Sequence, residues 1–299
     1  MLRLTMHLRF IRKVCAAFSL LFVLCAAAES TPVVKYANYT SYNSSYFSEI
    51  IGAAFEITRD TDGPYHLVPY EELLPSARVM LEVERGDIIN VLWGPAVTQL
   101  SQSNVIPIHI PLMKGLSGYR LMFIKDENQD FFDGIHKKTQ LNSFSVGQES
   151  GWMDVLIYLE NNMKVIRAPD FHSIFSMLNA KRFEAFPVAI TQITQILQDY
   201  NKEFPSLKVE EGIVIYYPLP FYFYVNSDQP EMAKRLKNGL ERMIESGEFD
   251  RRFDKHFKHL EKEFNLKERR VFTLKNQFLM EDIPFDRNEL WYYTLKNQN

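Results

Sequence analysis

The chain has 299 residues, of which 46% are hydrophobic and 14% aromatic, enough to bury the core of one large or two medium domains. Residues 1–28 contain four basic and no acidic side chains, which leaves 30 Lys and Arg against 37 Asp and Glu in the remainder. An acidic chain without a basic stripe argues against nucleic acid or an anionic membrane surface as a partner.

The first 28 residues have the pattern of a secretory signal peptide. Basic residues precede an apolar run over residues 14–24, and the small residues 25–28 then provide a cleavage site near Ala28. The apolar run is shorter than the roughly 20 residues of a membrane span, so an uncleaved anchor is the less favoured alternative. Both cysteines, Cys15 and Cys25, lie in this segment. The exported part therefore contains no disulfide.

After the signal segment, the pattern alternates between strands and helices. In chain order we expect a strand over 33–37, an Asn-, Tyr- and Ser-rich loop over 38–45, a helix to about Arg59, a strand over 65–69, a helix over 75–84 and a buried strand over 88–93. Gly94-Pro95 breaks the last of these strands. The β-α-β-α-β order is the pattern of a parallel sheet.

A second unit of the same kind follows a crossing strand over residues 118–125. Its elements are a strand over 143–146, a turn over 147–151, a helix over 152–162, a strand over 163–166, a helix over 171–181, a strand over 183–187 and a helix over 190–200. Gly147-x-x-x-Gly151 places a tight turn before a helix N-terminus, whose backbone N–H groups face the neighbouring cleft.

The remaining elements are expected to return to the first unit. Strands over 211–217 and 221–226 cross back, helices over 230–246 and 248–263 cover the first lobe, and the tail over 269–299 packs there as an extended flap. The predicted fold is α/β with two lobes, each a mainly parallel sheet flanked by helices, joined by two crossover strands. The predicted domains are the signal peptide over 1–28, lobe 1 over 29–117 and 219–299, and lobe 2 over 118–218.

Three motifs occur in order along the chain: Val146-Gly147-x-x-x-Gly151 before a helix, residues 180–185 (AKRFEA) at a helix-to-strand junction, and residues 246–250 (SGEFD) at the start of a closing helix. Together they resemble the V-G-x-x-x-G-[ST] turn, the N-G-R-x-D-A junction and the S-G-x-[YF]-x-x-[IL] helix pair of the periplasmic solute-binding proteins of family 3. The resemblance spans the chain to about residue 260. It implies the type II, two-lobed Venus-flytrap fold, a small-molecule ligand and no cofactor.

The residues that hold an α-amino acid in this family have no counterpart in the chain. The Arg that clamps the ligand carboxylate would fall near residues 100–102, which are Leu, Ser and Gln. The Asp that holds the amino group is matched by Ala189, and the hydroxyl after the second glycine by Trp152. A neutral side chain is a poor replacement for a bidentate guanidinium. The resemblance therefore implies a divergent member whose ligand is not an ordinary α-amino acid.

The candidate ligand-binding residues lie where the two lobes would meet, at strand ends and in the loops that follow them. They are Tyr39, Tyr42, Trp93 and Gly94 from the first lobe, with the adjoining Asn38, and Tyr119, Arg120, Gln148, Ser150, Trp152 and Pro187 from the second. Some have structural alternatives. Trp93 could belong to the core of its lobe, Arg120 could pair with a carboxylate beside the hinge, and Pro187 could simply end its strand.

No sequence signature of an enzyme is present, and His256 and His259, three residues apart, are more typical of a solvated helix face than of a metal site. The leading hypothesis is a periplasmic, monomeric binding protein that closes on a small polar ligand for a membrane transporter or sensor. One alternative is an enzyme on the same fold, similar to the related dehydratases, with Glu149 or Glu184 as the acid or base. Another is a binding or scaffold module whose tail docks a partner.

Overall fold

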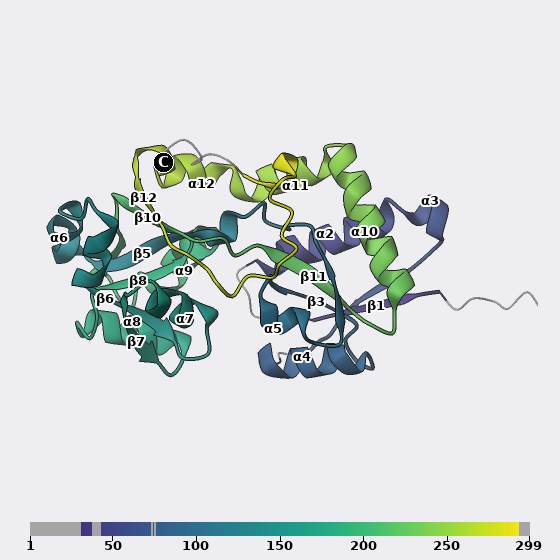
Figure 1. The fold of residues 1–299 in the computed structure, drawn as a ribbon, viewed down its shortest axis with the longest axis horizontal. Helices are drawn as coiled ribbons and strands as arrows, with labels where there is room; N and C mark the ends of the chain where they lie inside the picture. The colour runs from purple at the N-terminus through teal and green to yellow at the C-terminus, as the bar shows by residue number, and fades with distance from the viewer. Residues whose placement is uncertain (1–30, 38–42, 73, 75, 293–299) are drawn as a thin grey trace, which may run out of the picture.

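Two sheets, each flanked by helices, organise the chain into two lobes (Figure 1). The computed structural model describes residues 31–292 apart from 38–42, 73 and 75. The predicted two-lobed α/β fold is confirmed, whereas the predicted signal peptide lies outside the described residues. Within the described part of the chain, no helix is both long enough and apolar enough for a bilayer crossing.

The first lobe, on the right of Figure 1, is built on a five-stranded sheet of order β2-β1-β3-β11-β4. Its strands are β1 (Val33–Tyr36), β2 (His66–Pro69), β3 (Val91–Pro95), β4 (Val105–Ile108) and β11 (Phe221–Asn226). β1 runs parallel to β2 and β3, while β11 is antiparallel to β3 and β4. Its helices are α2 (Ser44–Glu56), α3 (Arg59–Asp62), α4 (Ser76–Arg85), α5 (Thr98–Ser101), α10 (Pro230–Glu245) and α11 (Glu248–Phe257).

The second lobe is built on a sheet of order β12-β10-β5-β8-β6-β7, with β9 also paired to β5. Its strands are β5 (Tyr119–Lys125), β6 (Ser145–Glu149), β7 (Lys164–Ala168), β8 (Ala185–Ala189), β9 (Leu207–Val209), β10 (Ile213–Tyr216) and β12 (Arg270–Thr273). Its helices are α6 (Gln129–Asp133), α7 (Met153–Glu160), α8 (Phe171–Asn179), α9 (Ile190–Tyr200) and α12 (His259–Glu263). Short 3-10 turns complete both lobes.

One edge of each sheet faces the other lobe. In the first sheet, β3 ends at Pro95, which pairs with Phe221 at the start of β11. In the second, β5 begins at Tyr119, which pairs with Tyr216 at the end of β10. β5 starts just after the chain leaves the first lobe, and β10 ends just before the chain returns to it. These strand ends are therefore the parts of the two sheets next to the connections between the lobes.

The C-terminal segment differs from the prediction, which placed residues 269–299 on the first lobe. β12 pairs in parallel with β10 and so belongs to the second sheet, and the isolated bridge between Val97 and Leu279 then brings the chain back to the first lobe. The chain therefore passes between the lobes twice more than the two crossovers predicted, once before β12 and once after it. Residues 270–273 add a strand beside β10, a long-range pairing that local pattern does not reveal. The domain boundaries themselves stay a prediction.

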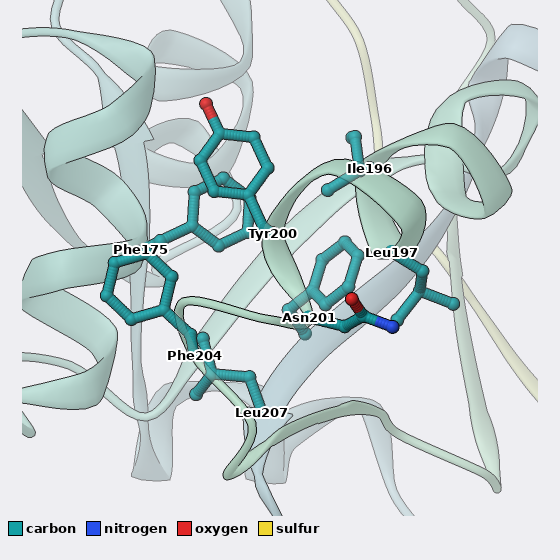
Figure 2. A pocket seen from close by; sticks show the side chains of 8 residues that line it. Phe175, Ile196, Leu197, Tyr200, Asn201, Phe204 and Leu207 are labelled. Atoms are coloured by element: carbon teal, nitrogen blue, oxygen red, sulfur yellow. The ribbon is translucent and has the colours of Figure 1, made fainter.

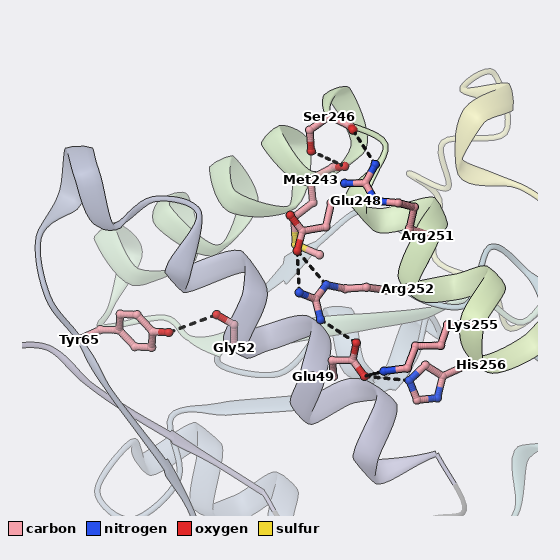
Figure 3. A network of polar contacts seen from close by, with 10 residues as sticks. All are labelled: Glu49, Gly52, Tyr65, Met243, Ser246, Glu248, Arg251, Arg252, Lys255 and His256. Carbon is pink, nitrogen blue, oxygen red and sulfur yellow. Dashed lines mark hydrogen bonds and ion pairs between the residues drawn. The ribbon is translucent and has the colours of Figure 1, made fainter.

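A network of charges holds α11 against α2 in the first lobe (Figure 3). Glu49 of α2 accepts from Arg252 Nη1 at 2.6 Å and lies 2.8 Å from His256 Nε2, while Arg252 also donates to Glu248. The Glu49 side chain is only 24% exposed. Burial alone would raise the pKa of Glu49, but the hydrogen bonds from His256 and Arg252 outweigh it and hold this pKa below its ordinary value of 4.5.

We expect Glu49→Gln to lower the free energy of unfolding by about 1 to 2 kcal/mol at neutral pH, because a charge-assisted hydrogen bond becomes a neutral one. A carboxylate whose pKa is lower in the folded than in the unfolded state stabilises the fold at a pH above the unfolded-state pKa. This stabilisation is lost as the pH falls through the folded-state pKa. The difference between the variant and the parent should therefore shrink below about pH 4 in urea unfolding. An equal difference at neutral and acidic pH would contradict this assignment, and the exposed Glu56→Gln serves as the control.

Candidate functional site

Three of the predicted ligand residues lie on one face of the second sheet, at the edge that faces the first lobe. Arg120 pairs with Ala189 across β5 and β8, and Met122 pairs with Pro187. Gln148 lies two residues beyond Val146, which pairs with Ala185, and its Nε2 donates to the Pro187 carbonyl at 2.8 Å. Since side chains alternate along a strand, Arg120, Gln148 and Pro187 share a face.

A buried ion pair joins this face to the first turn of α7. Arg120 Nη2 lies 3.0 Å from Asp154 Oδ1, with side chains 8% and 11% exposed. The guanidinium carbon lies 5.1 Å from the centre of the Tyr217 ring, and the Tyr217 hydroxyl donates to Asp154 and lies 3.2 Å from the Tyr158 hydroxyl. We call Arg120, Asp154, Tyr158 and Tyr217 the polar cluster.

The polar cluster carries no net charge. Burial alone would lower the pKa of Arg120, but the Asp154 carboxylate more than offsets this and raises the pKa, so the guanidinium stays charged. Burial raises the pKa of Tyr158 and of Tyr217, which therefore keep their protons. The charge of Arg120 is thus matched by Asp154 within its own lobe, which is the carboxylate pairing named above as the structural alternative. A ligand contact by Arg120 stays a prediction.

Two buried polar atoms on this face have no hydrogen-bond partner among the described residues. They are the Nε of Arg120, a donor, and the Oε1 of Gln148, an acceptor. Gln148 is fully buried and Arg120 is 7% exposed. An unpaired buried polar group costs about 1 to 3 kcal/mol, so a hydrogen bond from an ordered water or a ligand to either atom would stabilise it.

The two glycines of the turn before α7 have different roles. A Cβ on Gly147 would lie 2.1 Å from the Phe183 ring, so packing within the lobe requires glycine there. A Cβ on Gly151 would meet no described heavy atom within 4 Å. The turn therefore leaves open space beside the α7 N-terminus, where backbone N–H groups favour a polar ligand.

Other predicted residues of the second lobe have contacts inside that lobe. The Ser150 hydroxyl donates to the Ala168 carbonyl at 2.8 Å. The Trp152 ring packs against Phe171 and Phe186, with centroids 5.8 and 6.2 Å away. Tyr119 lies at the edge that faces the first lobe, its ring centre 4.6 Å from that of Tyr216. Both Ser150 and Trp152 therefore support the turn through their side chains.

In the first lobe, Trp93 is a core residue in this structure. It is 4% exposed, and its ring stacks on Phe47 of α2 with centroids 5.1 Å apart. The prediction of an open stacking surface at Trp93 is therefore not what the structure shows, because α2 covers the ring. A Cβ on Gly94 would lie 3.3 Å from Leu100, so Gly94 permits close packing there.

The loop after β1 contains the remaining candidates, Asn38, Tyr39 and Tyr42, which lie outside the described residues. At the end of this loop Asn43 Nδ2 donates to Thr191 Oγ1 at 3.1 Å. Asn43 precedes α2 in the first lobe and Thr191 lies in the first turn of α9 in the second. The two lobes thus contact each other at Asn43 and Thr191.

Comparison with known proteins supports the architecture and leaves the ligand open. No family model and no curated protein matches the sequence. The structure is similar to that of the probable amino-acid ABC transporter extracellular-binding protein YtmK from Bacillus subtilis, with a TM-score of 0.57 and 10% identity over 76% of this chain and 98% of that chain. The chain has the two-lobed periplasmic binding protein fold.

Two further solved structures give the same result. A Salmonella typhimurium periplasmic binding protein with high arginine specificity matches with a TM-score of 0.54 and 13% identity, over 76% of this chain and all of that one. An ancestral arginine-binding protein bound to glutamine matches with a TM-score of 0.55 and 14% identity, over 77% and 99%. At these identities the likeness shows the fold alone. About a quarter of this chain lies outside the shared periplasmic binding protein fold.

Figure 2 shows a small, mainly apolar pocket in the second lobe. It is lined by Phe123, Phe175, Ile196, Leu197, Tyr200, Asn201, Phe204 and Leu207. Phe123 is four residues along β5 from the edge, and Leu207 pairs with Lys125 still further on. Its lining contains no charged side chain, and it lies between α8, α9 and β5.

The sequence also raised a metal site, as a less favoured alternative, and two candidate acids or bases, Glu149 and Glu184. The described residues contain no group of three or more His, Cys, Asp or Glu side chains placed to hold a metal ion. Glu184 Oε2 accepts from the Ser145 amide at 2.6 Å and from its hydroxyl at 2.7 Å. Glu149, at the end of β6, differs, because burial and then the nearby Asp170 raise its pKa.

Sequence reasoning missed Asp154 and Tyr158 of the polar cluster. Asp154 stands in the first turn of α7, two residues after Trp152, and is 8% exposed. The available signal was an acidic residue at a helix N-terminus directly after the glycine turn. That position alone is ordinary for a surface helix, so only the fold reveals its pairing with Arg120.

Proposed function

We propose that this chain is an exported solute-binding protein that closes its two lobes on one small, neutral, polar ligand other than an ordinary α-amino acid. The fold supports a binding role between the lobes. We infer the ligand class from the polar cluster, whose charges balance, and from the unpaired atoms of Arg120 and Gln148 at the end of the sheet next to the first lobe.

The chemistry of these atoms favours a neutral ligand. A carboxylate would have to compete with Asp154 for a guanidinium that is already paired and buried. A hydroxyl or an amide can instead accept from Arg120 Nε, donate to Gln148 Oε1, or do both through neighbouring groups. Sugars, nucleosides and amides have such groups. Arg120 then orients the ligand through its Nε–H without supplying a net charge.

The signal-peptide pattern supports a periplasmic location for the mature chain. Closure of the lobes would convert binding energy into a shape that a membrane transporter or sensor can distinguish from the open form. The three proteins compared above bind or are named for amino acids, but the anchors for an α-amino acid are missing at residues 100–102 and at Ala189 in this chain.

A thermal-shift screen tests the proposal, because a ligand that binds only the folded state raises the unfolding temperature by mass action. Sugars, nucleosides, amides, organic acids and the common amino acids are added separately. We expect a neutral polar compound to give the large shift. A large shift with a common amino acid and none with neutral compounds would overturn the ligand class while leaving a binding role.

Gln148→Met keeps the length of the side chain and removes both polar atoms. We expect it to weaken binding of the compound found in the screen by about tenfold, the equivalent of one hydrogen bond. Isothermal titration calorimetry measures the change. Gln195→Met, on the exposed face of α9, is the matched control and should bind as the parent does. Unchanged affinity of Gln148→Met would place the ligand elsewhere.

An enzyme on the same fold is the second candidate, and Glu149 is the observation that favours it. Its raised pKa suits a carboxylic acid that donates a proton, and it ends β6 beside the glycine turn. One structural neighbour, an ancestral amino-acid-binding protein described as a precursor of cyclohexadienyl dehydratase, has a TM-score of 0.52. Conversion of the bound compound, lost in Glu149→Gln, would support this candidate, whereas its recovery unchanged supports simple binding.

A further inference from the structure

The C-terminal segment is anchored first on the second lobe. Beyond β12, the Leu274 amide donates to the Tyr216 carbonyl at 2.7 Å, which continues the pairing with β10. Asn161, at the C-terminus of α7, then exchanges two hydrogen bonds with the backbone of Lys275, at 2.8 and 3.0 Å. The segment is thus fixed to two separate elements of this lobe.

The segment next contacts two of the chain connections between the lobes, the one from β4 to β5 and the one from β10 to β11. Asn276 Nδ2 donates to the Pro218 carbonyl at 2.8 Å, in the connection between β10 and β11. Near its end the Tyr292 amide donates to the Lys114 carbonyl at 2.8 Å, in the connection between β4 and β5. A Cβ on Gly115 would lie 2.6 Å from the Trp291 ring, so this ring rests directly on the backbone of that connection.

Between these two points the segment is anchored on the first lobe. The Thr98 amide donates to the Phe278 carbonyl at 2.9 Å, and the Met280 amide donates to the Ala96 carbonyl at 3.2 Å. Arg287 forms a bidentate pair with Glu241 of α10, at 2.7 and 2.8 Å. Figure 1 shows the segment in yellow, passing from the second lobe across to the first.

The turn beneath Trp291 lies in the connection that leads from β4 in the first lobe to β5 in the second. Lys114 and Gly115 have φ values of 48° and 75°, so two successive residues adopt left-handed conformations just before β5. Domain closure in two-lobed proteins takes place through φ and ψ changes at a few loop or element-terminal residues, and this turn lies in such a position between β4 and β5. Here the Trp291 ring covers that turn, and its Nε1 is fixed to the Pro284 carbonyl at 2.8 Å.

We propose that residues 274–292 form a strap that limits how far the two lobes can separate. Separation requires rotation at the 113–118 and 217–220 connections and at the junction between α11 and α12. The strap is bonded to the first two of these connections and to each lobe. Ligand exchange then takes place through a restricted opening, and removal of the strap should release the lobes. The inference concerns motion and holds whatever the ligand is.

Distances between two spin labels, one on each lobe, test the strap. Both natural cysteines lie in residues 1–28, so Leu81→Cys on α4 and Glu160→Cys on α7 provide the only labelling sites in a chain that starts at residue 29. Both positions are exposed. We expect one narrow distance distribution for the intact chain without ligand, and a longer and broader one after deletion of residues 275–299.

A second variant keeps the whole chain and tests the strap even if the deletion variant fails to fold. Thr98→Val/Asn276→Ala removes side-chain hydrogen bonds that hold the strap to the first lobe and to Pro218. We expect a smaller broadening in the same direction. The control Thr61→Val/Asn104→Ala removes side-chain hydrogen bonds within the first lobe only and should match the parent. Distributions that are the same in the parent and in both strap variants would overturn the proposal.

Discussion

Asp154→Ala should destabilise the protein by about 3 to 5 kcal/mol, because it leaves the guanidinium of Arg120 buried without its partner. The ion pair is 3.0 Å long, and both side chains are about nine-tenths buried. The same change removes the acceptor of the Tyr217 hydroxyl, which is also buried. For a chain of this size, we expect the thermal unfolding midpoint to fall by roughly 10 °C.

A double variant separates the unpaired charge from other effects of the substitution. Arg120→Met/Asp154→Leu replaces the pair with apolar side chains of similar volume, and such replacements of buried ion pairs are often neutral or stabilising. We expect it to recover most of the stability lost in Asp154→Ala, as measured by urea unfolding. The assignment fails if Asp154→Ala unfolds at the same urea concentration as the parent. Asp60→Ala, which breaks an exposed pair with Arg242, is the control and should have little effect.

The elements that local pattern determines were predictable from the sequence. The helix over 190–200 was predicted with the bounds that α9 has, and the strands over 33–37 and 118–125 lie within a residue of β1 and β5. β4, β9 and β12 were not predicted. Each is four residues or shorter, and its strand state depends on a partner far away in the sequence, such as β10 for β12.

The candidate site was predictable in position and not in chemistry. Arg120 and Gln148 follow from the ends of strands that face the other lobe, and the fold does place them on one face. The pairing of Arg120 with Asp154, 34 residues away, depends on how α7 packs over the sheet. The sequence predicted Arg120 as a cationic anchor for the ligand. In the structure its charge is instead neutralised by Asp154 in a buried ion pair.

Gly239→Ala should destabilise the protein by about 2 kcal/mol although alanine is the better helix former. Gly239 lies in α10 where it crosses α2, and a Cβ there would lie 1.9 Å from the Ala54 carbonyl oxygen. Because that atom belongs to helical backbone, it cannot move aside as the end of a side chain can. Overpacking of this kind costs about 1 to 3 kcal/mol or more, with the upper part of the range expected for a backbone clash. The gain in helix propensity offsets only about 1 kcal/mol of it.

The facing helix provides the matched control. A Cβ on Gly52 of α2 would lie 3.5 Å from Leu67, an ordinary contact. The Gly52 carbonyl, which accepts from the Tyr65 hydroxyl in Figure 3, would be unchanged. Gly52→Ala therefore gains helix propensity without a clash and should stabilise by about 0.5 to 1 kcal/mol. Urea unfolding measures the change in the free energy of unfolding for each variant. A loss of stability in Gly239→Ala and a gain in Gly52→Ala would show that α2 and α10 pack this closely only because residue 239 is glycine. Stabilisation in both variants would mean that α10 can move away from α2 at little cost.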